Sequence, residues 1–328
     1  MMAGRTADGG RLVVVGPGRV GLSLAAALAD SVPLVSVEVR GRSDERPSFL
    51  RGRPAIASGR GPLGALEPGT RLVFTVPDDA LAETVREWAE AWRAAGHGMS
   101  AGHEASAAPA REDAPRAAEP PVALHTSGVH PASVLAPLGE LGASVAAWHP
   151  LTAVARPDAR ALRGVTWGLE GDERARAVAA RLTRALDGRT LPVAPGEHAR
   201  YHAAAVFASN FLVACLGAAA AELGAALEPG ASAGLGDLLP LARAALAQVE
   251  REGPEAGLTG PVARGDPGTV RAHLEALSPE RRSLYRGLAR ELLRLAAPGL
   301  APERAAELAE ALDAGHADTR SRSEEGHP

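Results

Sequence analysis

The sequence contains no lysine, and all 35 basic residues among its 328 are arginines. Because a guanidinium group stays protonated, arginine cannot form a Schiff base or serve as a general acid. The absence therefore excludes Schiff-base catalysis, a phosphate-loop lysine and a lysine general acid. Any acid or base that this protein uses must be His, Asp, Glu, Tyr, Cys or a water molecule.

Cysteine is almost absent as well, since Cys215 is the only one. A single cysteine excludes an internal disulfide and a cysteine-rich metal site, and we expect a reducing, cytoplasmic setting. The first residues lack the apolar core of a signal peptide, and no uninterrupted apolar run reaches the roughly 18 residues of a membrane span. With a formal net charge of −4, the chain gives no reason to expect a nucleic-acid or membrane partner.

Uniformly apolar short strands alternate with helical segments up to about residue 196. This pattern predicts an α/β fold with a doubly wound, mostly parallel sheet. We place this domain at residues 9–196, with a small, polar, proline-containing insertion at 94–120 that we expect to be disordered. An all-helical domain follows at 197–315, and a disordered tail at 316–328. Residues 197–227 read as one long helix, apolar nearly all round, which predicts burial inside the helical domain or in a dimer.

A glycine-rich turn, "GPGRVG" at residues 16–21, lies directly between a predicted strand and a predicted helix. Gly16 permits the tight turn, Gly18 lets the backbone approach a pyrophosphate, and Gly21 permits close packing of helix on strand. The context favours dinucleotide binding, and the alternative is a packing turn in a domain that has lost its ligand.

About twenty residues later, an acid would hold the ribose hydroxyls of NAD, but "VRGRS" stands there, with Arg40, Arg42 and Ser43. Guanidinium groups match phosphate in a bidentate manner, so the residues favour NADP(H), with its 2′-phosphate. Glu38 lies earlier, within the strand, and should be too deep or point away. The alternative for the two arginines is that they are ordinary surface charges. The alternative ligand for the glycine turn is S-adenosylmethionine, and the missing acid argues against it because an acid commonly holds its ribose.

Several motifs follow one another in the order and spacing of one family: "VVVGPGRVG", "VEVRGRS", "LVFTVPDDAL", "LHTSG", "WHPLTA", "YHAAAVFASNFLVA" and "LTGPVARGDPGTVRAHLEAL". Over residues 11–296, apart from the insertion, the chain resembles uncharacterised bacterial oxidoreductases that join a Rossmann-like NADP-binding domain to a C-terminal helical domain of unknown function. Those proteins are distant relatives of the 6-phosphogluconate dehydrogenase superfamily, which includes pyrroline-5-carboxylate reductase, ketopantoate reductase and the deazaflavin-dependent NADP reductases.

The resemblance implies cofactor contacts by two groups of residues: Gly16, Gly18, Arg19, Val20 and Gly21 at the turn, and Arg42 and Ser43 at the 2′-phosphate. It also implies that two later strand ends border the nicotinamide, namely Val76, Pro77 and Asp78, and Ser127 and Gly128. Some relatives place a catalytic lysine in the first helix after the Rossmann domain. This chain has no lysine there, so that mechanism is not carried over.

The predicted helix after residue 196 offers other groups for chemistry. His198 and His202, four residues apart, share one face, Ser209 lies nearly on the same stripe, and Asn210 is rotated away from it. We predict His202 as the proton donor and Asn210 as an amide that orients the substrate. A packing role for both is the alternative, and no metal is expected because no carboxylate stands at ligand spacing on this helix.

The remaining site candidates lie in loops and at strand ends. Ser127 is a further catalytic candidate, and Ser209, His149 and Arg264 are candidates for substrate binding, with packing or a partner subunit's carboxylate as alternatives. We expect an NADP(H)-dependent oxidoreductase that acts on a small carbonyl or imine compound with an anionic group, in the cleft between the domains of a homodimer. The alternative function is an NADP(H)-binding sensor or scaffold without catalysis.

Overall fold

The structure is a computed structural model that describes residues 10–32, 36–63, 67–96 and 119–314. The chain divides into two compact units, Met1–Ser209 and Asn210–Pro328, and each has hydrophobic clusters of its own. Most of the predicted insertion and the whole of the predicted tail lie outside the described residues.

The first unit is built on one sheet. Within the described residues its strands are β1 (Arg11–Val15), β2 (Ser36–Gly41), β3 (Ile56–Arg60), β4 (Arg71–Phe74), β5 (Val122–His125), β6 (Ser144–Pro150), β7 (Thr166–Gly171) and β8 (Arg189–Pro192). They lie in the order β3-β2-β1-β4-β5-β6-β7-β8, and every neighbouring pair is parallel except β6 with β7. The first six strands follow the 3-2-1-4-5-6 order of the Rossmann fold, which confirms the predicted fold class.

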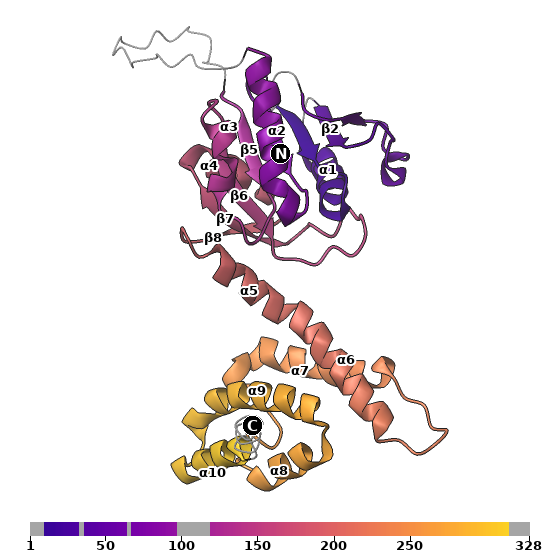
Figure 1. Ribbon diagram of the computed structural model, residues 1–328, viewed down its shortest axis with the longest axis vertical. Helices are drawn as coiled ribbons and strands as arrows, with labels where there is room; N and C mark the ends of the chain where they lie inside the picture. Colours follow the sequence, from indigo (N-terminus) through magenta and orange to yellow (C-terminus); the bar gives the residue numbers. More distant parts are fainter. Residues whose placement is uncertain (1–9, 33–35, 64–66, 97–118, 315–328) are drawn as a thin grey trace, which may run out of the picture. The chain divides into compact units, whose positions relative to one another are not determined.

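Helices cover both faces of this sheet (Figure 1). They are α1 (Arg19–Ser31), α2 (Asp78–Ala94), α3 (Ala136–Gly139) and α4 (Glu173–Ala185), with short 3-10 turns η1 (Ser48–Leu50) and η2 (Ala132–Leu135). A further helix, α5 (His198–Ala208), follows β8 and runs away from the sheet. Successive strand residues alternate between the faces: Leu12 and Val14 pack in the cluster that includes α1 and α4, and Val13 and Val15 in the cluster of α2 and α3. Both faces are therefore buried, as a parallel sheet requires.

Three features differ from the sequence-based expectation. β3, whose "IASGR" sequence has only one large apolar residue, was not predicted, because an edge strand needs little apolar surface. The predicted long helix is divided at Ser209, which has φ −126° and ψ −73° and donates from Oγ to the Ala205 carbonyl. α5 belongs to the first compact unit, so the boundary between units comes later in the chain than the predicted one after residue 196.

The second unit is helical. Its described elements are α6 (Asn210–Ala225), α7 (Leu235–Ala256), α8 (Pro267–Ala276), α9 (Pro279–Ala296), η3 (Ala297–Gly299) and α10 (Pro302–Asp313). A small core lies among α8, α9 and α10, made by Val262, Val270, Leu274, Ala289, Leu308, Ala311 and Leu312. Asp266 caps α8 by accepting a hydrogen bond from the Thr269 amide, 3.0 Å long. The sequence predicts this cap, because Asp266 is a good N-cap residue and a proline follows at the first helical position, and the structure confirms it.

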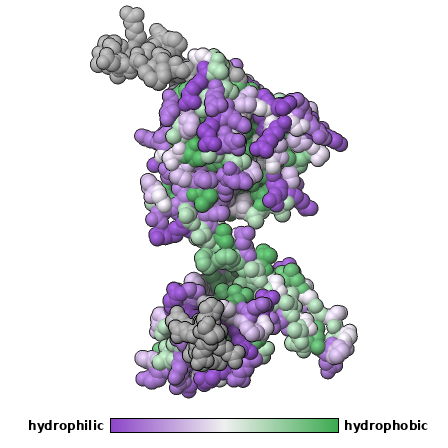
Figure 2. All heavy atoms as spheres, viewed as in Figure 1, coloured by the Kyte–Doolittle hydropathy of each residue, from purple (hydrophilic) through white to green (hydrophobic). Residues whose placement is uncertain are grey.

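Helices α6 and α7 contain no buried residue. Their exposed large side chains are Phe211, Leu212, Val213, Leu235, Leu241, Leu246 and Val249, and Figure 2 shows hydrophobic residues gathered over this part of the chain. The prediction that this segment is buried inside a helical domain is therefore wrong for the single chain. The Ala, Val and Leu neighbours of Cys215 in the sequence also predict a core position for it, and this is wrong as well, because Cys215 is half-exposed. Burial in a dimer is the expectation that stands.

The helical span His198–Ala225 is long and apolar enough to cross a membrane, with a hydropathy of 1.9 in its most apolar window. This span is not an uninterrupted apolar run in the sequence, because polar residues at 198, 202, 209 and 210 break it. Length and composition alone do not place a helix in a membrane, because core helices of globular proteins also pass this test. The first turn of α5 is bonded to the sheet of the first unit, as described below.

Candidate functional site

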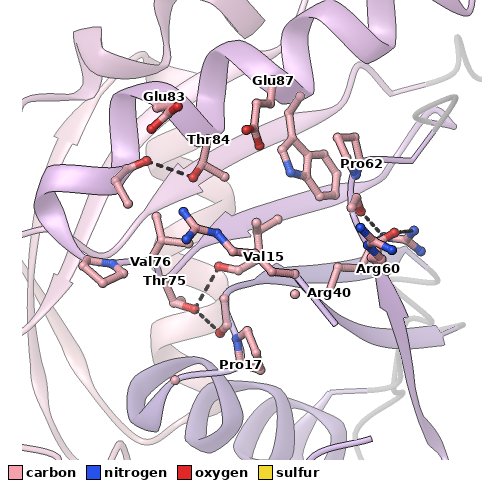
Figure 3. A pocket seen from close by; sticks show the side chains of 18 of the residues that line it. Val15, Pro17, Arg40, Arg60, Pro62, Thr75, Val76, Glu83, Thr84 and Glu87 are labelled. Atoms are coloured by element: carbon pink, nitrogen blue, oxygen red, sulfur yellow. Dashed lines mark hydrogen bonds between the residues drawn. The ribbon is translucent and has the colours of Figure 1, made fainter. Parts of the chain in front are cut away.

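The glycine turn connects β1 to α1 at the carboxyl edge of the sheet. Gly16 has φ +108°, a backbone conformation that residues other than glycine rarely adopt. A Cβ on residue 21 would lie 2.1 Å from the Gly16 carbonyl oxygen and 2.3 Å from Oγ1 of Thr75. That hydroxyl lies 2.8 Å from the Gly16 carbonyl and 3.1 Å from that of Val15, and both contacts are drawn in Figure 3. Gly16 and Gly21 are therefore required by the turn itself.

Gly18 differs from these two glycines. A Cβ there would meet only the Thr75 carbonyl oxygen, 4.0 Å away, and the backbone has an ordinary φ of −76°. Gly18 caps α1 without a side-chain hydrogen bond, so the first amide groups of the helix stay open. It lines a cavity of about 940 Å³. The missing Cβ thus leaves space for a ligand, and helix amides with a positive dipole end suit a pyrophosphate.

The arginines after β2 have two different roles. Arg40 lines the cavity, but its guanidinium pairs with Glu38 and donates to the carbonyls of Arg60 and Gly61. Glu38 also pairs with Arg11 at 2.7 Å and does not line the cavity, as expected. Arg40, one of the two arginines that favour NADP(H) in the sequence, therefore bonds within the protein, and Arg42 stays the candidate of the pair.

Arg42 is exposed and lines the same cavity. Ser43 is also exposed, and its hydroxyl accepts a 3.0 Å hydrogen bond from the Glu45 amide, so its oxygen supports the local turn. Val76 and Pro77 line the cavity from the end of β4, while Asp78 begins α2. Arg19 and Val20 form the first turn of α1. The predicted cofactor residues of β1, β2 and β4 thus lie around or beside one cavity.

The loop after β5 is fixed by buried hydrogen bonds. The His125 ring accepts from the Ser127 amide at 3.2 Å and donates from Nε2 to the Pro131 carbonyl at 3.2 Å. Burial lowers the pKa of His125 to about 4, so it is neutral at pH 7. Ser127 is buried, and its Oγ accepts from the amides of Val129 and His130. His125 lies inside a predicted strand, which favours a structural role, and these bonds agree with that role. Ser127 stabilises the turn, and its catalytic role stays a prediction.

Two histidines and a tyrosine meet where β6 ends. Oη of Tyr201 lies 3.0 Å from Nδ1 of His149, and the His202 ring stands edge-on to the His149 ring with centroids 5.8 Å apart. A Cβ on Gly128 would lie 2.6 Å from His202 and 3.0 Å from Nε2 of His149. Gly128 is therefore a glycine because the two imidazole rings fill the space beside it.

Gly168 on β7 has the same relation to Tyr201. A Cβ there would lie 2.3 Å from Oη, and the Gly168 backbone hydrogen-bonds to the phenol. Burial raises the pKa of Tyr201 to about 12, so the phenol keeps its proton. Its nearer acceptor is Nδ1 of His149, since the His149 carbonyl is 3.4 Å away. We therefore assign the ring proton of neutral His149 to Nε2.

Electrostatics keep one imidazole of the cluster neutral. Burial, followed by the neighbouring charge of His202, lowers the pKa of His149 to about 4. Within the described residues the half-buried His202 ring makes no hydrogen bond, so both its nitrogens are available. The arrangement therefore combines a neutral, fixed imidazole with a second imidazole that lies beside it and makes no hydrogen bond within the described residues.

His198 anchors the start of α5. It is buried, and its Nε2 lies 3.2 Å from Oε2 of Glu170, which also accepts a 2.8 Å hydrogen bond from the Ala132 amide. His198 and His202 therefore contact different residues, although they are four positions apart on one helix. His198 contacts Glu170 of β7, and His202 lies beside His149. Sequence reasoning missed Tyr201, Glu170 and Gly168. Their only signal was a polar residue or glycine within an otherwise apolar segment.

The other predicted residues lie farther along the chain. Ser209 ends α5, whereas Asn210 and Arg264 belong to the second unit. Arg264 is exposed in the loop before α8. Their roles with substrate stay predictions.

Comparisons with known proteins agree with this architecture. Residues 165–292 match a family described as a domain of unknown function, DUF2520. No curated protein matches the chain. A proposed NADP oxidoreductase from Bacteroides fragilis is 21% identical, with a TM-score of 0.60 over 88% of this chain and 100% of that chain. A Thermotoga maritima protein is 19% identical, with a TM-score of 0.60 over 88% of this chain and 99% of that chain.

An imine reductase from Pseudomonas is 15% identical, with a TM-score of 0.50 over 94% of this chain and 95% of that chain. At such identities the likeness shows the shared fold. A Rossmann-like sheet followed by helices, with a domain of unknown function at the C-terminal side, is the combination that the sequence resemblance implied. The resemblance is thereby confirmed at the level of fold.

Proposed function

We propose that this protein is an NADP(H)-dependent oxidoreductase that reduces a small carbonyl or imine compound carrying an anionic group. The observation that carries the proposal is the placement of two features on one edge of one sheet. The open cradle at Gly18 follows β1, and the cluster of His149, Tyr201 and His202 stands at the end of β6. In open α/β sheets, ligands bind outside the carboxyl ends of the strands.

The residues of the first unit fit the cofactor. The α1 amides and Gly18 would hold the pyrophosphate, and Arg42 with Ser43 would take the 2′-phosphate. Val76, Pro77 and Gly128 would border the nicotinamide, which supplies a hydride when bound. The proposed oxidoreductase activity also agrees with the names of the proteins that share the fold.

His202 is the proton donor of this proposal. Reduction of a C=O or C=N bond also places a proton on the oxygen or nitrogen, and a positioned side chain accelerates that step. A proton on His202 disfavours a second one on His149, so His149 stays a neutral donor from Nε2 that can orient the substrate. Tyr201 fixes the His149 ring through Nδ1.

Three further residues keep the substrate roles that the sequence suggests for them. Asn210 would orient the substrate through its amide, with Ser209 beside it in the chain. Arg264 would bind the anionic group of the substrate, because an exposed guanidinium in a constrained loop matches carboxylate or phosphate.

A titration with NADPH and with NADH tests the cofactor, followed by a carbonyl and imine substrate screen. Tight NADPH and weak NADH binding is expected. In the same screen, His202→Ala should lose turnover and keep its NADPH affinity, while His273→Ala, an exposed histidine of α8, serves as the control. A protein that binds NADPH and turns over no compound would support the sensor alternative, and binding of neither nucleotide would refute the proposal.

We also propose a homodimer in which a second copy covers α6 and α7. The support is the row of exposed Leu, Val and Phe side chains on these helices, of which Leu241 and Val213 are 70% and 69% exposed. Contiguous apolar surface of this kind is rare on monomers. Light scattering should give twice the chain mass, and Leu241→Glu with Val213→Glu should give one chain mass. A monomeric wild-type protein would refute the dimer.

A cytoplasmic location is the last part of this proposal. The start of α5 is held to the sheet by His198 and Tyr201, so the first turn of the apolar span is attached to a globular unit. Cell fractionation should recover the protein with the cytoplasmic fraction. Retention in membranes after an alkaline carbonate wash would instead identify the apolar span as a membrane anchor.

A further inference from the structure

Arg60 ends β3, the edge strand that the sequence pattern did not reveal. In the parallel register of β2 and β3 it stands beside Gly41, one residue before Arg42. Both Arg42 and Arg60 are exposed and line the cavity that Gly18 also lines. Across the described part of the chain, neither guanidinium has an ion pair or a side-chain hydrogen bond. Two uncompensated positive charges therefore stand at the ends of neighbouring strands.

Arg40 holds the backbone that carries Arg60. Its Nη2 donates to the Arg60 carbonyl and its Nε to the Gly61 carbonyl, while Glu38 balances its charge. The side chain is only 15% exposed. Figure 3 shows Arg40 and Arg60 together at the Pro62 end of the cavity. The Arg40 guanidinium thus donates its hydrogen bonds to the backbone at the end of β3. Arg60 lines the cavity from that strand end.

We infer that Arg42 and Arg60 form a two-arginine clamp for the 2′-phosphate of the adenosine half of NADP(H). Arg60 is then a specificity-determining residue and Arg40 a positioning residue. This inference rests on the proposed function and deepens it. Guanidinium groups bind phosphate oxygens in a bidentate manner, and a phosphate dianion offsets the repulsion between them. A ribose with two free hydroxyls offers no such charge.

The opposite wall of the cavity restricts where the phosphate can lie. Asp79, Glu83 and Glu87 line it from α2 at intervals of four residues, so they share one face of that helix. Figure 3 shows Glu83 and Glu87 across the cavity from the arginines. Like charge keeps a phosphate away from this wall, so the strand side is where an anion would bind.

Calorimetric binding of two fragments tests the clamp without any turnover. The probes are adenosine 2′,5′-bisphosphate, which carries the 2′-phosphate, and adenosine 5′-monophosphate, which does not. The measured quantity is the ratio of their dissociation constants in the full-length protein. Arg60→Gln is the test variant. Arg51→Gln is the matched control, because Arg51 is an exposed arginine just before β3 that does not line the cavity.

The wild-type protein and Arg51→Gln should both prefer the bisphosphate. Arg60→Gln should reduce that preference roughly tenfold or more, as expected for loss of a charge-assisted contact, and should leave monophosphate binding unchanged. Arg60→Lys should give an intermediate ratio, because it keeps the charge and loses the bidentate geometry. An unchanged ratio in Arg60→Gln would overturn the role of Arg60.

Two further results separate this inference from the proposed function. Should the wild-type protein bind NADPH and NADH equally well, the clamp is wrong while dinucleotide binding stands. Should it bind neither nucleotide and neither fragment, the proposed function fails and the clamp with it. For Arg40→Gln the expected result is a lowered fragment ratio, and a variant that loses only thermal stability would restrict Arg40 to a structural role.

Discussion

Substitution by alanine should have different effects at Gly18 and Gly21: it should weaken cofactor binding at position 18 and destabilise the fold at position 21. Gly18→Ala adds a methyl group whose nearest neighbour, the Thr75 carbonyl oxygen, would be 4.0 Å away, whereas Gly21→Ala places it 2.1 Å from the Gly16 carbonyl oxygen. The first variant tests the ligand cradle, and the second tests the packing of the turn. Because both changes add the same atoms within one short loop, each variant is a control for the other.

The expected magnitudes follow from the geometry. Gly18→Ala restricts the unfolded chain, which stabilises by about 0.4–1 kcal/mol, and replaces a good N-cap residue, which costs a similar amount. The free energy of unfolding should therefore change by less than about 1 kcal/mol. Gly21→Ala must displace the Gly16 carbonyl or Thr75, and overpacking of this kind costs about 1–3 kcal/mol or more.

Cofactor affinity should separate the two variants. In Gly18→Ala the new methyl occupies the space proposed for the pyrophosphate, so the NADPH dissociation constant should rise by about ten- to a hundredfold. The assays are urea unfolding for stability and nicotinamide fluorescence for binding. A Gly18→Ala protein that folds normally and binds NADPH like the wild type would refute the cradle, because the glycine would then have no role toward a ligand.

Three further predictions concern the histidine cluster and its surroundings. His202→Ala should lower turnover by about 10²–10⁴-fold, the usual contribution of a positioned proton donor, and an unchanged turnover number would exclude that role. Tyr201→Phe removes the hydrogen bond to Nδ1 of His149, so the turnover number should fall more than the NADPH affinity, as steady-state kinetics beside a binding titration would show; equal losses in both would contradict a positioning role. The folded-state pKa of His125 lies near 4, below the usual 6.5, so its stabilising contribution is present above pH 6.5 and is lost as the pH falls toward 4. Urea unfolding should therefore show a loss of about 2 kcal/mol from this residue between pH 7.5 and pH 5, and His125→Gln should flatten that dependence; an equally steep loss in the variant would assign it to other groups.

Local patterns were sufficient for much of the first unit and for one helix cap of the second. The turn at residues 16–21 and the cap at Asp266 depend on residues within a few positions of each other, so their spacing is visible in the chain. Alternating apolar strands and helices predicted the parallel sheet, because burial on both faces demands uniformly apolar strands. β3 escaped because an edge strand with small and polar residues lacks that signature. The cofactor preference could be argued from the missing acid after β2.

Only the tertiary structure could decide which polar side chains are already bonded within the protein. Arg40 and Arg42 look alike in the sequence, yet the backbone at residues 60 and 61 takes the donors of one and leaves the other open. Tyr201 and His149 are 52 positions apart and meet because α5 returns to the end of β6. The sequence by itself thus determined the fold class and the place of the glycine turn, since both arise from local spacing and burial. The composition of the histidine cluster was decided by long-range packing, because a hydrogen bond depends on distance and direction that no spacing along the chain specifies.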